Sequence, residues 1–169
     1  MIFAGTVLAE AIGIEDGKNV CQTQSYGPEA RGGASRSDLV VGSGEIHYPK
    51  PLKLDLLLAL TQEACDTYFP ALKEDGCLIV DSGLVDQLPD HQIHGFPFTQ
   101  IARDKIGTPM VANMIALGAI VALTKIASKK GLLEAVKRRA PKGTEERNLM
   151  AIEAGFELVQ KSKRTRKRK

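Results

Sequence analysis

The pattern of apolar and polar positions changes character along the chain. Short apolar runs of strand length alternate with polar turns in the first part, and longer stretches with helical spacing follow from residue 98 onward. We predict strands over 19–24, 34–41, 54–60 and 76–81. We predict helices over 2–14, 62–69, 99–106, 110–126, 129–139 and 144–160.

The order of these predicted elements indicates the fold class. Helices that alternate with short apolar strands are typical of an α/β domain. We therefore expect three layers, with a mostly parallel sheet flanked by helices and a helical C-terminal part. The segments 49–51 and 88–97 contain prolines and polar residues, and we expect both to be surface connections.

One stretch of the helical part is apolar almost throughout. The run from 110 to 123 contains Asn113 as its single strongly polar residue. The run is too short to cross a bilayer, so we expect a buried helix and no membrane association. A buried Asn113 would need hydrogen-bond partners, which such a residue commonly finds by tying down a neighbouring loop.

Composition fits one globular domain followed by a charged tail. A chain of 169 residues with 43% hydrophobic residues can bury a core, and we assign this domain to residues 1–160. Residues 161–169 hold seven of the 23 Lys and Arg residues, a density typical of a disordered extension. Without this tail, 16 cations face 20 acids, so the domain itself is acidic. Nucleic-acid binding through the tail is therefore kept only as an alternative of another class.

The cysteines and the first residues indicate the cell compartment. Cys21, Cys65 and Cys77 lie far apart and form no Cys-x-x-Cys, so neither a disulfide framework nor a zinc site is indicated. Glu10 and Glu15 interrupt the first apolar stretch, and no basic segment precedes it, so we expect no signal peptide. We therefore expect a cytoplasmic protein.

The connection between the first two predicted strands holds more chemistry than a turn requires. Two to five residues are enough for a hairpin turn, whereas this connection over residues 25–33 reads SYGPEARGG. The Gly27-Pro28 pair would form a stiff turn that holds Tyr26 in one direction. The Gly32-Gly33 pair allows successive backbone N–H groups to point into one concavity, beside the guanidinium of Arg31. This arrangement would suit a phosphate or a carboxylate.

The strand that follows this connection adds alternating side chains. Ser35 and Ser37 share one face of the strand, and Arg36 and Asp38 share the other. We predict no catalytic residue and no metal ligand. The predicted ligand-binding or interface residues are Ser25, Tyr26, Gly27, Pro28, Glu29, Arg31, Gly32, Gly33, Ser35, Arg36 and Asn113.

Two alternatives compete with a ligand site in the connection. Double glycines near an arginine are most often turns with a solvated charge. Equally, Glu29 and Arg31 could pair across a subunit interface, because interfaces and phosphate sites use the same residue types. Outside the connection, His91 and His94 lack further ligands at suitable spacing, and we expect them to be solvated surface residues.

Five stretches, in order, carry a resemblance to a known family. They read QSYGPEARGGASRSDLVV, IHYP, LDLLLALTQEA, GCLIVDS and VANMIALGA. Over nearly the whole chain they resemble the gamma subunit of 2-oxoacid:ferredoxin oxidoreductases. The first stretch is most similar to the 2-oxoglutarate branch, and the 2-oxoisovalerate and pyruvate branches are kept as alternatives. The family's Asn-Met motif falls on Asn113 and Met114.

The resemblance implies a subunit of a larger enzyme. Such an enzyme decarboxylates 2-oxoglutarate on thiamine diphosphate, passes electrons through iron–sulfur clusters to ferredoxin, and releases succinyl-CoA. Thiamine diphosphate, magnesium and the clusters are implied to belong to alpha, beta and ferredoxin-like delta subunits, so this chain alone is expected to bind no cofactor and to be inactive. It is expected to supply interface contacts and contacts to coenzyme A (CoA), whose phosphates suit Arg31 and Arg36. Homodimerisation is a further option.

The chain departs from this family at both ends. Family members begin with a strand and a Gly-x-Gly-Gly-Gln-Gly turn ahead of the helix matched by residues 2–11, and this sequence shows neither. Another chain could take the place of that strand, the sheet could close without it, or the start codon could be placed inside the natural reading frame. A helix that begins at Met1 has no capping residue ahead of it, which favours the last of these options. The second departure is the basic tail.

Overall fold

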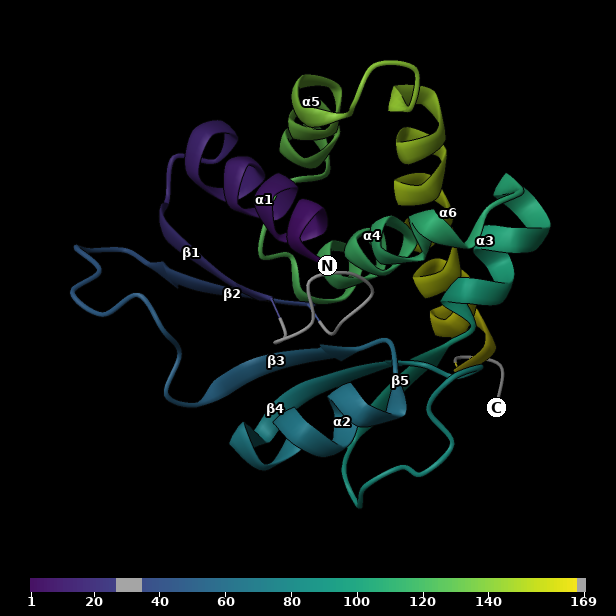
Figure 1. Cartoon of the computed structure of the whole chain (residues 1–169), viewed down its shortest axis with the longest axis horizontal. Coiled ribbons are helices and arrows are strands. Elements are labelled where there is room, and N and C mark those ends of the chain that lie inside the picture. Colours follow the sequence, from purple (N-terminus) through teal and green to yellow (C-terminus); the bar gives the residue numbers. More distant parts are fainter. Residues whose placement is uncertain (27–34, 167–169) are drawn as a thin grey trace. The chain divides into compact units, whose positions relative to one another are not determined.

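The computed structural model describes residues 1–26 and 35–166, with side chains as far as residue 162 (Figure 1). The chain divides into two compact units, and each is described by itself. Unit 1 comprises Met1–Pro51 and Val121–Leu149, and unit 2 comprises Leu52–Ile120 and Met150–Lys169. The helices α4 (Ala112–Thr124) and α6 (Glu145–Arg166) contribute residues to both units.

Unit 1 is built on the antiparallel strands β1 (Asn19–Tyr26) and β2 (Ser35–Gly42). The helix α1 (Ile2–Glu10) packs on this pair and continues into a π-helical turn over Ala11–Glu15. The helix α5 (Lys129–Arg139) packs against α1 and the π-helical turn. The fully buried apolar side chains of these helical segments include Val7, Ile12, Leu132 and Val136.

A glycine sets the distance between α1 and the strand pair. A Cβ atom built on Gly5 would lie 2.0 Å from Ser37 Oγ of β2 and 3.0 Å from Gln22 Nε2 of β1. Real Cβ atoms do not approach other atoms so closely, so α1 can rest on the strands at this distance only because residue 5 has no side chain.

Unit 2 contains a three-stranded parallel sheet in the order β3 (Leu54–Ala59), β4 (Leu72–Asp81) and β5 (Ile93–Phe96). The helix α2 (Gln62–Tyr68) contributes Cys65 to an apolar cluster with residues of β3 and β4, including Leu57 and Leu78. The side chain of Thr61 caps this helix by accepting a hydrogen bond from Ala64 N. The helix α3 (Phe98–Ile106) follows β5.

The helices α4 and α6 cross within unit 2 at two glycines. A Cβ on Gly118 of α4 would lie 2.3 Å from Ile152 O of α6. A Cβ on Gly155 of α6 would lie 2.1 Å from Ile115 O and 2.7 Å from Ala119 N of α4. The two backbones therefore touch directly, and neither position can accept a larger residue without moving a helix.

The predicted α/β class is confirmed, but the strands pair differently from the expectation. In the described part of the chain they form an antiparallel pair and a separate parallel sheet, where we expected one mostly parallel sheet. The reason lies in the connections. Only eight residues separate β1 from β2, which is too few for a crossover connection, so these strands can pair only antiparallel, whereas α2 provides the crossover that places β3 and β4 parallel.

Several boundaries also differ from the predictions. β5 lies within the segment 88–97 that we expected to be a surface connection, because four residues that include Gly95 carry too weak a pattern to be recognised. The first apolar helix ends in a π-helical turn rather than as a regular helix to residue 14. The predicted helix over 129–139 matches α5.

The predicted disordered tail differs from the structure as well. α6 continues past residue 160 to Arg166, and so includes part of the segment 161–169. Lys and Arg have good intrinsic helix propensity, and cations are favoured near a helix C-terminus, so a helix that is already packed can extend into such a sequence. Among the described residues, no helix is both long and apolar enough to span a membrane.

Candidate functional site

The two strands of unit 1 frame the predicted ligand or interface loop. Ser25 pairs with Arg36, and Tyr26 pairs with Ser35, at the ends of β1 and β2 where the loop begins and ends. The predicted residues that lie outside the described ranges are Gly27, Pro28, Glu29, Arg31, Gly32 and Gly33. The structure therefore places the base of the loop.

Tyr26 is the last residue of β1 and has a largely exposed ring. Its side chain is 69% exposed, which is unusual for an aromatic residue at the end of a paired strand. Because the ring stands beside the predicted loop, it is available to stack on a ligand or to insert into a neighbouring chain.

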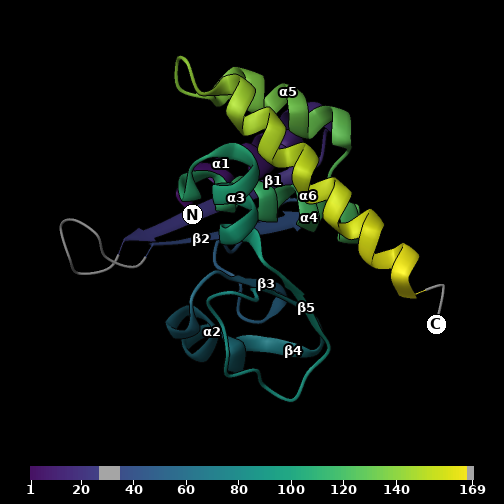
Figure 2. The same ribbon diagram turned by 90° about the vertical axis from the view of Figure 1, so that its right-hand side faces the viewer.

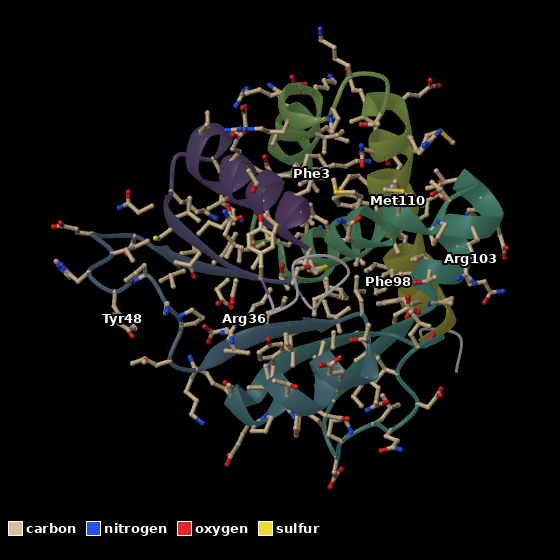
Figure 3. All side chains as sticks on the ribbon, in the orientation of Figure 1. Phe3, Arg36, Tyr48, Phe98, Arg103 and Met110 are labelled. Atoms are coloured by element: carbon tan, nitrogen blue, oxygen red, sulfur yellow. The ribbon has the colours of Figure 1, made fainter. Side chains whose placement is uncertain are left out.

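Arg36 is engaged by a carboxylate of its own strand. Its Nε atom donates to Asp38 Oδ1 at 2.7 Å, and the side chains are 35% and 16% exposed. The prediction that these two residues share a face of the strand is confirmed. Figure 3 labels Arg36 among the side chains of the strand pair. An anionic ligand at Arg36 would have to compete with Asp38.

The opposite face of β2 is directed toward α1. Gln22 Nε2 donates to Ser37 Oγ at 2.9 Å, and Thr6 of α1 donates to Gln22 Oε1 at 3.3 Å. Ser35 Oγ accepts a hydrogen bond from the terminal amine of Met1 at 3.4 Å. Ser35 is therefore positioned by α1, and the polar contacts at Gln22 hold the strands beneath that helix.

Three acidic residues attach α5 to the end of α1. Arg139 bonds to the buried carboxylate of Glu10, and Arg138 NH2 lies 2.5 Å from Glu15 Oε1. At the other end of α5, Asp16 accepts hydrogen bonds of 2.6 Å from both the backbone N and the Oγ of Ser128. A hydrogen bond with Glu15 raises the pKa of Arg138, which therefore stays charged.

The charged contacts of α5 were not predicted from the sequence. Glu10, Glu15 and Asp16 lie more than one hundred positions from their partners, and acids at the end of an apolar helix resemble an ordinary solvated face. The π-helical turn was not predicted from the sequence either. Glu10, Glu15 and Asp16 hold α5 against α1, and α1 in turn packs on the strand pair that carries the candidate loop.

Asn113 belongs to unit 2 and has a buried, unpaired oxygen. Its Oδ1 atom has no hydrogen-bond partner among the described residues, although the side chain as a whole is only half-buried. The predicted role of tying down a loop is thus not seen for this atom within the described residues. An unpaired amide oxygen is costly in a protein interior, so a further donor from a ligand or another chain would stabilise it.

Asp81 is the buried polar centre of unit 2. Its Oδ2 accepts hydrogen bonds from Thr99 N at 2.8 Å and Thr99 Oγ1 at 2.6 Å, and its Oδ1 accepts one from Gly83 N at 3.0 Å. Asp81 therefore caps the start of α3, where Pro97 supplies no side-chain cap. We did not predict this role, although the Asp-Ser-Gly that ends β4 was visible in the sequence.

The two histidines of the 88–97 segment are more structural than we expected. Nε2 of His91 lies 2.7 Å from Gly76 O, and its ring packs edge-on against Phe69. His94 lies in β5, opposite Ile79. The prediction of solvated surface histidines is wrong for His91, because β5 draws this segment onto the sheet.

The described residues include no cluster of three or more side chains suited to hold a metal ion. The thiols of Cys65 and Cys77 are also unsuited to react. Cys65 is buried, and burial, followed by the charge of Asp66, raises its pKa. Burial likewise raises the pKa of Cys77. Both thiols are therefore protonated at neutral pH, as inert packing groups are.

The chain belongs to the pyruvate ferredoxin/flavodoxin oxidoreductase family, whose model matches residues 1–158. Two relatives confirm the resemblance to gamma subunits. The 2-oxoglutarate synthase subunit KorC of Methanocaldococcus jannaschii is 45% identical over 163 residues, which cover 94% of this chain and 87% of that protein. The keto/oxoacid ferredoxin oxidoreductase gamma subunit from Geobacter sulfurreducens PCA is 48% identical, with a TM-score of 0.80 over 92% of this chain and 89% of its own.

A larger enzyme shares the fold at lower identity. The structure of 2-oxoglutarate:ferredoxin oxidoreductase from Magnetococcus marinus, with 2-oxoglutarate, coenzyme A and succinyl-CoA bound, matches with a TM-score of 0.75 at 22% identity. The match covers 94% of this chain and 28% of that chain. The gamma-type fold therefore also occurs as one part of a longer polypeptide.

Proposed function

We propose that this chain is the gamma subunit of a cytoplasmic 2-oxoglutarate:ferredoxin oxidoreductase. The observation that carries the proposal is the 45% identity to a 2-oxoglutarate synthase subunit, which extends over 94% of the chain. A match that covers 94% of this chain and 87% of that protein is expected of a subunit with the same place in the same kind of enzyme.

In this proposal the chain assembles with alpha, beta and ferredoxin-like delta subunits. Thiamine diphosphate, magnesium and iron–sulfur clusters belong to those partners, in agreement with the three widely separated cysteines of this sequence. The chain is inactive alone. We further propose that residues 1–160 act as one domain, which the contribution of α4 and α6 to both compact units supports.

The loop between β1 and β2 is the proposed contact of this subunit with CoA or a partner chain. The exposed ring of Tyr26 at its base supports either role, because aromatic rings both stack on nucleotide bases and anchor interfaces. Glu29, Arg31 and the glycines Gly27, Gly32 and Gly33 belong to the same proposal. Because Arg36 already pairs with Asp38, Arg31 is the better candidate to donate hydrogen bonds to a phosphate of CoA.

The proposal is tested by purifying the tagged chain from its own cells. We expect the alpha, beta and delta subunits to copurify, and the eluate to reduce ferredoxin with 2-oxoglutarate in a CoA-dependent reaction. Isolation of the chain alone, or of a complex that prefers pyruvate or 2-oxoisovalerate, would contradict it.

The two roles of the loop are separated by Arg31→Gln in the assembled complex. If Arg31 holds a CoA phosphate, the KM for CoA rises by about tenfold while the KM for 2-oxoglutarate and the subunit composition stay unchanged. If it serves the interface, the complex dissociates at lower salt instead. Arg147→Gln, which removes an exposed arginine from the first turns of α6, is the matched control.

A further inference from the structure

Two exposed segments of this chain combine apolar side chains with charges of opposite sign. The first is the connection that leads from β2 into β3, and we call residues 48–53 the basic arm. Its apolar side chains Tyr48 (Figure 3) and Leu52 are 57% and 81% exposed, and Lys50 and Lys53 of the same segment are exposed as well. Neither lysine pairs with another side chain among the described residues, and residues 46–54 contain no acid. The arm is therefore available for a contact outside its own chain.

The second segment lies where strands of unit 2 end. It comprises the first turns of α2 and the start of the connection after β4, and we call it the acidic patch. Its apolar side chains Leu84 and Leu88 are 46% and 53% exposed. Its exposed carboxylates are Glu63, Asp66 and Asp86. No cation occurs in residues 60–72 or 82–90, so the patch repels nucleic acid and anionic lipid and favours a partner with cations.

The loop of the acidic patch is held in place by α2 and by the core of unit 2. The Oε1 atom of Gln62 accepts hydrogen bonds from Asp86 N at 3.0 Å and Gln87 N at 2.9 Å, and its Nε2 atom donates to Gln87 O at 2.9 Å. Val85 is buried in the apolar cluster that α2 forms with β3 and β4. Figure 2 shows α2 alongside these strands. Because the loop is already ordered, a partner that binds it loses little conformational entropy.

The arm and the patch lie at opposite edges of the sheet of unit 2. β3 and β4 pair in parallel, so their amino ends lie at one edge and their carboxyl ends at the other. Leu52 and Lys53 immediately precede β3, whereas α2 follows β3 and the loop of the patch follows β4. The six residues of β3 span about 20 Å. Leu52 and Lys53 are therefore too far from the patch to cover it within one chain.

We propose that the basic arm of one copy of this chain docks on the acidic patch of a second copy. Each surface presents exposed apolar side chains together with charges of one sign, and the two signs are opposite. The contact therefore buries the apolar side chains of both surfaces and pairs the lysines with carboxylates. A two-fold arrangement allows each copy to contribute one arm and one patch at the same time. This contact is independent of the proposed enzyme function.

The contact is tested by exchanging the charges of its two sides in the full chain. One variant carries Lys50→Glu with Lys53→Glu, and the other carries Glu63→Lys with Asp86→Lys. Each variant alone brings like charges together, so its dimer dissociation constant, measured by sedimentation at about 100 mM salt, should rise by at least about tenfold. An equal mixture of the two variants restores opposite charges at both contacts, and it should dimerise within about threefold of the unaltered chain.

A matched pair of apolar variants tests the other part of the contact. Leu84→Ser with Leu88→Ser removes the exposed leucines of the patch and should raise the dissociation constant by at least about tenfold. The control is Met110→Ser with Met150→Ser, which removes side chains of unit 2 that are 84% and 51% exposed, and it should change the constant by less than about twofold. Urea titration of each variant verifies that the chain still folds.

Three results would overturn the proposal. A mixture of the charge-exchanged variants that dimerises no better than either variant alone would show that the arm does not pair with the patch. Equal weakening by the leucine and methionine variants would show a general effect of surface hydrophobicity. A chain that stays monomeric, but binds a different subunit of the assembled enzyme through the patch, would assign the patch to that subunit instead.

Discussion

The two units of this chain are stabilised by different kinds of contact. In unit 1 no residue of β1 or β2 is fully buried, and ion pairs and charge-assisted hydrogen bonds supplement the buried apolar contacts of α1 and α5. In unit 2 the end of β4 is buried over Leu78–Asp81, and two helices touch through glycine backbones. The strand pair that carries the candidate loop is therefore half-exposed and bordered by polar contacts, whereas the sheet of unit 2 has a buried centre and its helices are close-packed.

The largest effect is expected from an added methyl group at the crossing of α4 and α6. In Gly155→Ala the new Cβ would lie 2.1 Å from Ile115 O, a backbone atom that cannot rotate away. We expect the free energy of unfolding, measured in urea, to fall by about 3 kcal/mol or more.

The same change in unit 1 tests the difference between the units. In Gly5→Ala the new Cβ would lie 2.0 Å from Ser37 Oγ, which can move away by a rotamer change, and 2.8 Å from Ser37 Cβ, which cannot, so a loss of about 2 kcal/mol is expected. Gly44→Ala, with no atom within 4 Å of the new Cβ, is the control and should change stability by less than about 0.5 kcal/mol. Equal losses at Gly5 and Gly155 would remove the proposed difference between the units.

The next effect concerns the buried carboxylate of unit 2. Asp81→Asn replaces an acceptor oxygen with an amide group and leaves a donor of Thr99 or Gly83 unpaired. We expect a loss of about 2 kcal/mol in the free energy of unfolding. The exposed Asp90→Asn should be nearly silent, and a similar loss in both variants would show that net charge, not the cap of α3, is responsible.

A smaller effect is expected from the ion pairs of unit 1. Glu10→Gln removes the charge that faces Arg139, but the guanidinium is 53% exposed and can be hydrated instead. A loss of about 1–2 kcal/mol is therefore expected, and it should shrink when the urea titration is repeated at high salt. Glu134→Gln, which removes an exposed pair with Lys137, should cause little measurable change.

The smallest effect is kinetic and concerns the thiols of unit 2. Because the pKa values of Cys65 and Cys77 are raised by burial, the reactive thiolates form only at higher pH than in an unfolded chain. We expect a disulfide reagent at pH 8 to modify these two residues at least about tenfold more slowly than in urea, with rates that rise as the pH is increased. Peptide mapping after brief exposure identifies the modified residue, and fast reaction of folded Cys65 would contradict its burial.

The candidate site could be predicted in part from the sequence. The face shared by Arg36 and Asp38 followed from strand alternation, and the structure confirms it. The ion pair between these residues did not follow, because alternation says which side chains are neighbours but not which of them bond. Asp81 was missed for a related reason: its partner Thr99 lies 18 positions away, beyond any local pattern.

Elements with local and strong signals could be predicted from the amino-acid sequence alone. The helix over 129–139, the buried run of α4 and the α/β class all follow from periodicity within short windows. The family followed from motifs spread along the chain, and the family model confirms it. In each case the information lies in the order and spacing of nearby residues.

The contacts between distant residues became apparent only from the folded chain. The acids at the end of α1 pair with arginines of α5, and α4 and α6 cross at their glycines. The segment around His94, whose strand pattern is weak, forms a strand because it pairs with β4. These outcomes depend on contacts between residues far apart in the chain, whose free energies no local pattern records.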